Sequence, residues 1–282
     1  MTLREAIQNL QNKLGHCYAE GEAQAITSWV LEHLFERKWT SLLASDHLQL
    51  NTIQEKLLEN YTLELLQHKP VQYVLNTAYF YNLQLFVDEN VLIPRSETEE
   101  LVAWIIAFCK EKKWASPRIL DIGTGSGCIA LALKKMIPQA VVTGLDISKA
   151  ALAVAEKNCK LQQLDITWVC DDVLHPQTVA NQRWDIIVSN PPYIIEVEKN
   201  SMEANVLNYE PHQALFVTDN NPLQFYHAIL KYSKSHLEQG GSVFFELNQN
   251  HAQLTLEDAK NKGWKVDLKK DMNDNDRMLR CS

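Results

Sequence analysis

Short apolar runs alternate with amphipathic segments from residue 118 to residue 247, and this alternation restricts the fold more than any other feature of the chain. Five runs predict strands and two longer segments predict helices, the strands at 118–122, 140–145, 166–169, 184–189 and 242–247 and the helices at 128–136 and 149–161. Short apolar strands separated by helices are typical of parallel sheets that are covered on both faces. We therefore predict an α/β fold with a doubly wound, mostly parallel sheet.

The carboxyl-terminal segment predicts a different kind of pairing. Residues 264–269 and 277–281 have strand character, and the polar turn Asn273-Asp274-Asn275 separates them. Two strands joined by a short turn pair antiparallel. We expect them to complete a seven-stranded sheet with an antiparallel edge strand.

The first 70 residues predict helices. Apolar side chains recur at helical spacing in three stretches, at Leu3, Ile7, Leu10 and Leu14, at Ile26, Val30 and Leu34, and at Ile53, Leu57, Tyr61 and Leu65. Thr52, with Glu55 three residues later, predicts a capping box at the start of the last helix, and Pro70 predicts its end. Helices of this kind favour a small bundle.

Residues 71–87 connect the two regions and are rich in aromatic and β-branched side chains, which predicts a β-hairpin. A chain of 282 residues exceeds one typical core. We therefore expect a helical domain at 1–70, a hairpin linker at 71–95 and an α/β domain at 96–282.

Charge and composition exclude several classes of protein. The formal net charge of −8 disfavours affinity for a phosphate backbone, so we expect no direct nucleic-acid binding. The six cysteines form no Cys-x-x-Cys pair and the histidines are scattered, so we predict reduced thiols and no metal site. No apolar run approaches the length of a spanning helix, and the amino terminus differs from a secretory signal. We expect a cytoplasmic protein without membrane contact.

A glycine-rich loop follows the first strand of the predicted sheet. It contains Gly123, Thr124, Gly125, Ser126 and Gly127. Glycines let the backbone lie against a ligand, and open α/β sheets bind ligands at this end of their strands. The Gly-x-Gly-x-Gly spacing differs from the dinucleotide fingerprint, and the preceding Asp121 suits an ammonium group better than a pyrophosphate. We predict that the five loop residues bind a cofactor, although a dinucleotide site or a plain turn would also fit.

Acidic residues end the next two strands. Asp146 closes the second strand, where a carboxylate can accept hydrogen bonds from both hydroxyls of a ribose. Ser148 is the better N-cap for the following helix, which leaves Asp146 available for a ligand. Asp171 and Asp172 close the third strand, where one carboxylate can accept from an adenine amino group while Val173 packs on the ring. Without a ligand, these positions would be a helix-start carboxylate and a solvated acidic turn.

The loop Asn190-Pro191-Pro192-Tyr193 follows the fourth strand. Proline carries no N–H and fixes its own φ, so the loop is stiff and its carbonyls have no competing donors nearby. The Asn190 side-chain oxygen and the Pro191 carbonyl are two acceptors for an NH₂ group, and Tyr193 can stack on a planar amide or base. We predict that all four residues bind a planar, NH₂-bearing acceptor, with Asn190, Pro191 and Tyr193 as catalytic residues. A proline turn capped by tyrosine is the purely structural interpretation.

With these motifs the chain resembles the class I methyltransferases and, within them, the release-factor glutamine N5-methyltransferases of the HemK type. The resemblance runs nearly end to end, through Leu92-Ile93-Pro94-Arg95, Glu97-Thr98-Glu99, Asp121 to Gly127, Asn190 to Tyr193, Gly240-Gly241 and Asp276-Arg277. It implies a Rossmann-like fold, S-adenosyl-L-methionine as methyl donor and S-adenosyl-L-homocysteine as product. It also implies that peptide chain release factors are the substrates, methylated at the glutamine of their Gly-Gly-Gln loop and held in part by the helical domain and hairpin. The implied donor contacts are Gly123 to Gly127, Asp146, Val173 and Asn190.

The chain departs from the usual pattern of this family at a few positions. Ser96 replaces a second proline, Asn76 and Asn82 stand where glycine is usual, and Val173 replaces an aromatic residue. The Pro-Arg-Ser sequence is also similar to enzymes that methylate a glutamine of a ribosomal protein, whereas Glu97-Thr98-Glu99 favours the release-factor group. Three more distant functions also compete: an adenine N6-methyltransferase, which would bring a basic groove, a nicotinamide-dependent reductase and a non-catalytic binding module.

Overall fold

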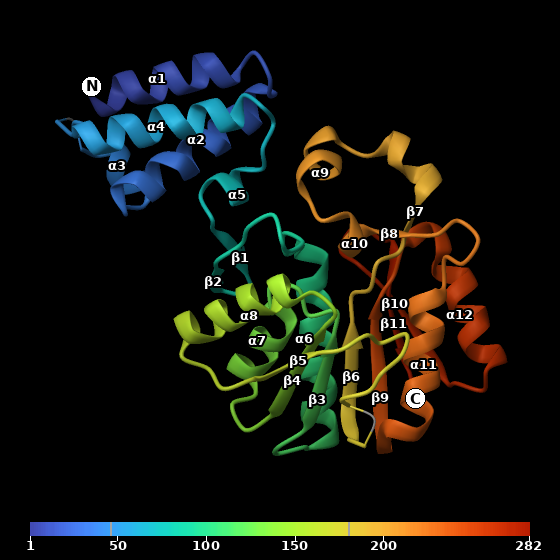
Figure 1. Cartoon of the computed structure of the whole chain (residues 1–282). Helices are drawn as coiled ribbons and strands as arrows, with labels where there is room; N and C mark the ends of the chain where they lie inside the picture. The colour runs from blue at the N-terminus through green and yellow to red at the C-terminus, as the bar shows by residue number, and fades with distance from the viewer. Residues whose placement is uncertain (46, 180) are drawn as a thin grey trace. The chain divides into compact units, whose positions relative to one another are not determined.

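The structure is a computed structural model that describes residues 1–45, 47–179 and 181–282. The chain divides into two compact units, one made of residues 1–77 and 203–209 and the other of residues 78–202 and 210–282. Figure 1 labels the helices and strands of both units. Each unit has its own hydrophobic core.

The first unit is helical, as the sequence predicts. Its elements are α1 (Leu3–Leu14), α2 (Glu20–Phe35), α3 (Trp39–Leu43), α4 (Thr52–Leu65), α5 (Val71–Val74) and, from later in the chain, α9 (Ala204–Tyr209). The apolar sides of α1, α2 and α4 share one core, in which Leu14, Leu31 and Leu65 are fully buried.

The capping box of α4 lies one residue earlier than predicted. Asn51, and not Thr52, is the N-cap, because its side-chain oxygen accepts hydrogen bonds from the backbone N–H groups of Ile53 and Gln54, both at 2.9 Å. The Gln54 side chain accepts in return from the Asn51 N–H at 3.0 Å. Asparagine is at least as good an N-cap as threonine, so the prediction of Thr52 with Glu55 was wrong.

The buried face of α4 also differs from the prediction. Ile53 is 71% exposed, whereas Leu58 and Thr62 are buried together with Leu65. The helix ends at Leu65, several residues before Pro70. Between the two, His68 takes a left-handed conformation with φ of 62°. Apolar spacing identified the helix but not the side that faces the core.

The segment predicted to form a hairpin contains one helical turn before it. After α5, strands β1 (Ala78–Phe80) and β2 (Leu83–Leu85) pair antiparallel. Tyr81 and Asn82 between them have φ of 47° and 61°, the positive values that a two-residue type I′ turn requires. Asn76 also has a positive φ, 49°. Asparagine tolerates this region better than most residues, so Asn76 and Asn82 can replace the glycines usual in the family.

The second unit contains the predicted seven-stranded sheet. The strands, in spatial order, are β10 (Val266–Lys270), β11 (Asp276–Cys281), β9 (Leu237–Glu246), β6 (Trp184–Ser189), β3 (Arg118–Ile122), β4 (Val141–Asp146) and β5 (Thr167–Cys170). Among these strands β11 alone runs against the others, since it pairs antiparallel with both β9 and β10. The mostly parallel sheet with an antiparallel strand near its edge is confirmed.

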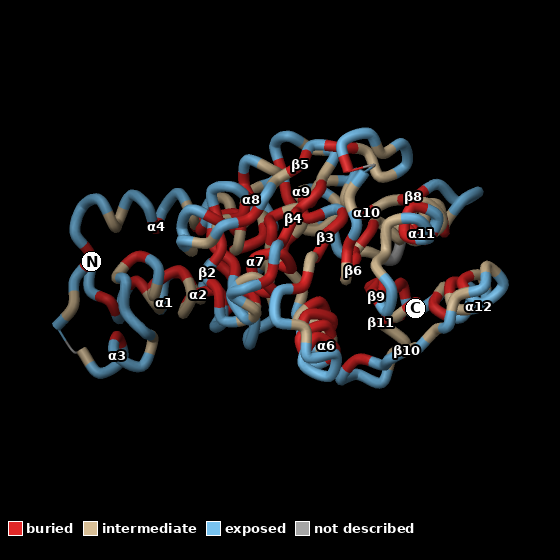
Figure 2. The backbone as a smooth tube through the Cα atoms, turned by 90° about the horizontal axis from the view of Figure 1, so that it is seen from below, coloured by how far each residue is buried: buried red, intermediate tan, exposed pale blue. Residues whose placement is uncertain are grey.

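Helices cover both faces of this sheet. They are α6 (Ser96–Lys112), α7 (Cys128–Met136), α8 (Lys149–Gln162), α11 (Gln224–His236) and α12 (Ala252–Asn261). The remaining short elements are β7 (Ile194–Ile195), η1 (Glu196–Ser201), α10 (His212–Leu215), β8 (Phe216–Val217) and η2 (Gln249–His251). The central strands are buried, whereas the outer sides of the helices are exposed (Figure 2).

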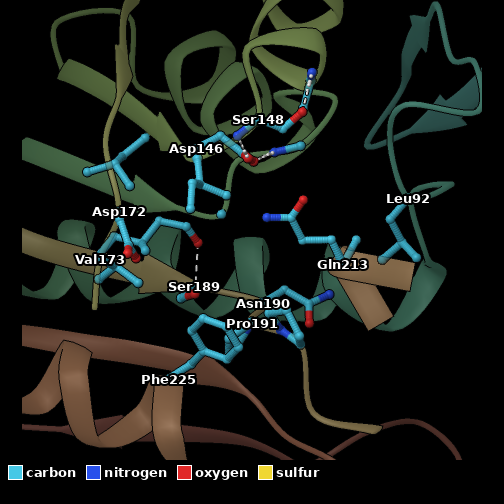
Figure 3. A pocket seen from close by; sticks show the side chains of 18 of the residues that line it. Leu92, Asp146, Ser148, Asp172, Val173, Ser189, Asn190, Pro191, Gln213 and Phe225 are labelled. Atoms are coloured by element: carbon cyan, nitrogen blue, oxygen red, sulfur yellow. Dashed lines mark hydrogen bonds between the residues drawn. The ribbon is translucent and has the colours of Figure 1, made fainter. Parts of the chain in front are cut away.

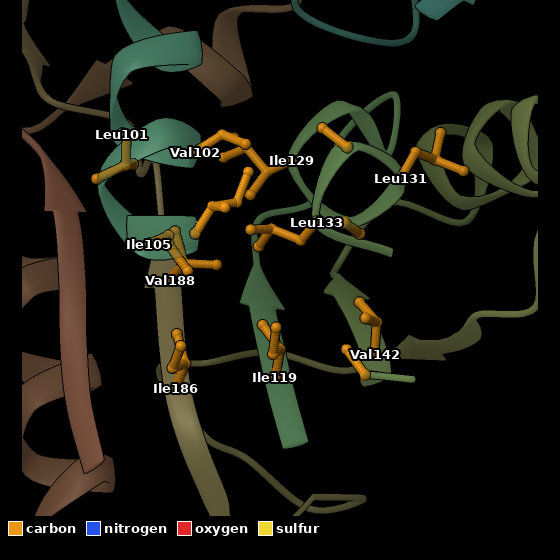
Figure 4. Packing of buried hydrophobic residues seen from close by; sticks show 14 of the residues in the cluster. Leu101, Val102, Ile105, Ile119, Ile129, Leu131, Leu133, Val142, Ile186 and Val188 are labelled. Atoms are coloured by element: carbon orange, nitrogen blue, oxygen red, sulfur yellow. The ribbon is translucent and has the colours of Figure 1, made fainter. Parts of the chain in front are cut away.

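Alternate residues of the strands enter two different cores. Ile186 and Val188 of β6 pack in the cluster that contains residues of α6 and α7, which Figure 4 shows, and Ile187 packs in the cluster that contains residues of α11 and α12. Successive side chains of a strand point to opposite faces of the sheet. The division of β6 between two cores is therefore the packing that a doubly wound sheet requires.

Candidate active site

A cavity of about 270 Å³ lies at the carboxyl ends of β3, β4, β5 and β6. The chain leaves β3 toward β4 and β5 on one side and returns to β6 and β9 on the other, so the cavity is at the point where the strand order reverses. Open α/β sheets bind ligands at this point. Figure 3 shows Asp146 and Ser148 on one side of the cavity and Asn190 and Pro191 on the other.

Two glycines of the predicted cofactor loop face this cavity. Gly123 and Gly125 have φ of +71° and +55°, and no atom lies within 4 Å of the position that a Cβ would take. Both residues line the cavity. Gly127 also has a positive φ, but a Cβ there would be 3.0 Å from the Trp168 side chain. The first two glycines leave room for a ligand, and the third permits close packing of the helix.

Hydrogen bonds of Thr124 and Ser126 fix the glycine loop to the protein interior. The Thr124 hydroxyl donates to Asp121 Oδ2 at 2.6 Å, and the Asn158 side chain donates to the Ser126 carbonyl at 3.0 Å. Among the residues that the structure describes, Thr124, Ser126 and Gly127 are not part of the cavity lining. Direct contact of these three residues with a cofactor stays a prediction. In the structure Thr124 and Ser126 are buried, and Gly127 packs against Trp168.

Asp121 is fully buried under the same loop. Its Oδ2 also accepts from the Ala130 N–H at 3.2 Å, while Oδ1 has no hydrogen-bond partner in the described part of the chain. Burial raises the pKa of this carboxyl to about 7. The residue expected to face an ammonium group thus supports the loop, and it is outside the cavity lining.

Asp146 joins the glycine loop to the start of α8. Its Oδ2 accepts from the Gly125 N–H and its Oδ1 from the Ser148 N–H, both at 2.9 Å. Burial raises the pKa of Asp146. Ser148 is the N-cap of α8, as predicted, since its hydroxyl accepts from the Ala151 N–H at 3.2 Å. Asp146 therefore lines the cavity without being needed to cap the helix.

Both residues of the acidic pair after β5 line the cavity, and Asp171 also shapes the turn that follows. The Asp171 carboxylate accepts from the backbone N–H groups of Gln177 and Thr178, which together with the Asp172 N–H lower its pKa although burial opposes them. Asp172 accepts from the Leu174 N–H at 2.8 Å and lines the cavity with Val173. Asp171 shapes the turn, and ligand contact by Asp172 and Val173 stays a prediction.

The loop after β6 is held by side chains from distant elements. Asn190, Pro191 and Pro192 line the cavity. The Asn190 side-chain amide donates to the Thr98 hydroxyl of α6 at 3.3 Å, and this hydroxyl donates to Oε2 of Glu246, the last residue of β9, at 2.6 Å. Thr98 and Glu246 are each 2% exposed. Burial raises the pKa of Glu246.

Tyr193, which we predict to wall the cavity, is not among the residues of the described cavity lining. Its hydroxyl donates to Glu246 Oε1 at 3.2 Å, and its carbonyl accepts from the Asn248 side chain at 3.2 Å. Burial raises the pKa of the phenol. Because both ends of Tyr193 bind protein groups, the residue supports the loop from outside the described cavity lining.

The buried carboxylate of Glu210 connects two further segments of the cavity lining. Arg95 Nη2 lies 2.6 Å from Glu210 Oε1, and the Ile93 N–H donates to Glu210 Oε2 at 3.4 Å. This ion pair ties the segment after the hairpin, where Leu92 lines the cavity, to the segment of Gln213. Figure 3 shows the Gln213 side chain pointing into the cavity. Sequence reasoning did not identify Gln213, since no motif surrounds it.

Two negative observations apply to the described residues. No group of three or more histidine, cysteine, aspartate or glutamate residues in residues 1–45, 47–179 and 181–282 is placed to hold a metal ion. Within the same ranges, no helix has both the length and the apolar character needed to cross a membrane.

The chain is similar to known proteins over both of its parts. The family model of the methyltransferase small domain matches residues 105–219, and that of the PrmC N-terminal domain matches residues 3–75. Among solved structures, the hMettl16 catalytic domain superposes with a TM-score of 0.55 at 16% identity and covers 82% of each chain, which shows the fold alone.

Two curated relatives extend over most of the sequence. The release factor glutamine methyltransferase of Flavobacterium psychrophilum is 43% identical over 271 residues, 95% of each chain. The protein of the same name from Bacteroides thetaiotaomicron is 39% identical over 244 residues, 86% of each chain. Similarity at this level covers the helical region, the glycine loop and the Asn190 loop, and the chain belongs to the family of release factor glutamine methyltransferases.

Proposed function

We propose that this chain transfers a methyl group from S-adenosyl-L-methionine to the side-chain amide nitrogen, N5, of the glutamine in the Gly-Gly-Gln motif of peptide chain release factors. The observation that carries the proposal is a single cavity with two different walls, open glycine backbone beside Asp146 and the acceptor-bearing loop of Asn190 and Pro191. The relatives from F. psychrophilum and B. thetaiotaomicron are named for glutamine methylation of release factors.

The glycine wall fits a methyl donor that carries a nucleoside. Gly123 and Gly125 leave open space in which the backbone can lie against the donor. Each Asp146 oxygen accepts one backbone N–H and keeps a further lone pair for a ribose hydroxyl. Asp172 would accept from the adenine amino group while Val173 packs on the ring. When bound, S-adenosyl-L-methionine supplies a methyl group that its positive sulfur already activates.

The opposite wall fits the amide of a glutamine. An amide nitrogen is a poor nucleophile, because its lone pair is delocalised into the carbonyl. Asn190 Oδ1 and the Pro191 carbonyl would accept its two hydrogens and direct the lone pair toward the methyl group, with Pro192 beside them. As the N–C bond forms, the C–S bond breaks and sulfur keeps the electron pair. One amide proton then passes to solvent, so no strong base is required.

We assign recognition of the protein substrate to residues 1–70, with 71–95 as linker and 96–282 as the transfer domain. The match of the PrmC N-terminal domain model to residues 3–75 supports this assignment. The net charge of −8 also favours a protein over a nucleic acid as substrate. Cross-linking of the full chain to a release factor, followed by mass spectrometry, should place most cross-links on residues 1–70. Cross-links confined to 96–282 would contradict the assignment.

The decisive experiment mixes the full chain and S-adenosyl-L-methionine with a bacterial release factor. Mass spectrometry should find one added methyl group, on the Gly-Gly-Gln glutamine. A release factor with asparagine in place of that glutamine is the matched control and should stay unmodified. Parallel reactions contain ribosomal proteins and double-stranded DNA, and methylation of either one without the release factor would overturn the proposed substrate.

A further inference from the structure

Four side chains beside the cavity form one continuous series of hydrogen bonds. Asn190 donates to Thr98, Thr98 donates to one oxygen of Glu246, and Tyr193 donates to the other oxygen. The residues come from the loop after β6, the first turn of α6 and the end of β9. Only Asn190 of these four lines the described cavity, so the other three act on a ligand through it.

The series has a direction, because its hydrogen bonds converge on the carboxylate of Glu246, which accepts from both sides. A hydroxyl carries a single hydrogen, and at 2.6 Å from Glu246 the Thr98 hydrogen is committed to the carboxylate. Toward Asn190, Thr98 can therefore only accept. The NH₂ end of the Asn190 amide must face Thr98, which leaves Oδ1 as the end available to the cavity.

Direction matters because asparagine has two chemically opposite ends of similar size. If the amide turned over, its NH₂ group would face the NH₂ group of the acceptor, and two donors cannot bond to each other. If the Asn190 amide had no fixed orientation, the loop would lose its side-chain hydrogen-bond acceptor in part of the molecules. Thr98 and Glu246 are each 2% exposed, so surrounding protein holds both in place.

We propose that Thr98 and Glu246 are positioning residues for methyl transfer: they fix the Asn190 amide with its oxygen toward the acceptor nitrogen. The Tyr193 hydroxyl donates to the second oxygen of Glu246 and so connects the same loop to β9. This inference rests on the proposed function, since it needs an NH₂-bearing acceptor. It adds two residues, from α6 and β9, that make no contact of their own with the described cavity.

The first test removes the hydroxyl of Thr98. Thr98→Val has nearly the same shape but cannot accept from Asn190, and we expect kcat to fall about 10- to 100-fold. The KM for release factor and the Kd for S-adenosyl-L-methionine should stay within about twofold, because the glycine wall is untouched. Thr98→Ser restores the hydroxyl and should recover most of the lost kcat. Thr255→Val, a buried threonine of α12 that donates to the His251 carbonyl, is the matched control for loss of a buried hydroxyl.

The second test changes the end of the series. In Glu246→Gln either end of the new amide can face Thr98, so the series loses its single direction, and we expect kcat to fall about three- to tenfold. This isosteric variant keeps the inference testable should Thr98→Val fold poorly. In the Asn190→Ala background, Thr98→Val should have almost no further effect on kcat, since its action passes through Asn190.

A third readout does not depend on the identity of the acceptor. The side-chain NH₂ resonances of Asn190, assigned by their loss in Asn190→Ala, should shift in Thr98→Val and return toward their original positions in Thr98→Ser. Wild-type protein that methylates no release factor would refute the proposed function, while these resonances would still decide the inference. Unshifted resonances, full kcat in Thr98→Val, or an equal fold-loss with and without Asn190 would each overturn the positioning role.

Discussion

The glycine loop after β3 and the Asn190 loop after β6 end neighbouring parallel strands, yet they are held in different ways. The glycine loop is shaped by its own torsions and by hydrogen bonds to Asp121, Asp146 and Asn158, which lie 3, 21 and 32 residues from their partners in the loop. The Asn190 loop is fixed by Thr98, 92 residues earlier, and by Glu246, 53 residues after Tyr193. The glycine wall therefore depends on elements that follow one another in the chain, whereas the wall that we propose to orient the acceptor depends on packing of α6, β6 and β9.

This difference predicts that substitutions on the two walls change different quantities. Changes in the glycine wall should alter donor affinity. Changes in the Asn190 wall should alter turnover at saturating donor and acceptor. Three substitutions test that division, and a fourth, Asp121→Asn, tests how the glycine loop is supported.

Asn190→Ala should produce the largest effect. It removes the side-chain acceptor, and we expect kcat to fall about 1000-fold, the upper part of the range for loss of one preorganised group. The Kd for S-adenosyl-L-methionine should stay within about tenfold. Mass spectrometry of release factor after timed reactions measures turnover. Asn250→Ala, which removes an exposed amide bonded to Glu198, serves as control. Unchanged turnover in Asn190→Ala would refute the catalytic role of this residue.

Gly125→Val should act on the other wall. The new side chain fills the open space beside a residue with φ of +55°, and we expect donor affinity to fall about 100-fold, equivalent to about 2.7 kcal/mol. Gly263→Val is the matched control, because Gly263 also has a positive φ, +87°, with nothing within 4 Å. Gly263→Val should lower stability by a similar amount without lowering the affinity for S-adenosyl-L-methionine. Isothermal titration measures both affinities, and equal losses would break the comparison.

Asp121→Asn tests whether the glycine loop is supported from beneath. Burial raises the Asp121 pKa from an ordinary 3.8 to about 7, so the folded state favours the protonated carboxyl. The stability that this preference contributes is complete below pH 4 and is lost as the pH rises through about 7. The neutral asparagine lacks this dependence. We expect its melting temperature at pH 8, relative to wild type, to be about 3–6 °C higher than the same difference at pH 5. If the melting temperatures of wild type and Asp121→Asn changed equally between pH 5 and pH 8, Asp121 would not be a buried carboxyl with a raised pKa.

Tyr193→Phe should have the smallest effect. It removes one hydrogen bond to Glu246, of 3.2 Å, and keeps the ring, so we expect kcat to fall by about fivefold or less. Tyr226→Phe is the control, because its hydroxyl donates to the backbone carbonyl of Glu246 and not to the carboxylate. A large loss in donor affinity with Tyr193→Phe would show that the two walls are not independent.

Much of the fold could be predicted from local patterns. The predicted bounds of β3, α7 and β6 agree with the structure, since each is a mainly apolar segment that turn or polar residues delimit. The buried face of α4 was not predicted, because Ile53 and Leu57 compete with Leu58 for the same helical spacing. Only the surrounding helices decide between those two faces.

The site could be predicted where the signal was a polar residue at a strand end. Asp146 and Asn190 met that rule. Glu246 meets it too, but the predicted strand continued to Leu247, which placed the glutamate inside it. Thr98 stood in a recognised motif, yet its role depends on a partner 148 residues away. Tyr193 was assigned to the cavity because it belongs to the same loop as Asn190. No local pattern in the sequence could show that its hydroxyl is bonded to Glu246.

The placement of β11 imposes an order on the assembly of the sheet. The strand follows β10 in the chain but lies between β9 and β10, so β10 has no place in the sheet before β11 arrives. During synthesis, the outer edge of β9 stays unpaired until residues 276–281 have left the ribosome. An open apolar edge attracts other strands. A nascent chain stalled before residue 276 therefore exposes the edge of β9 to pairing with other strands.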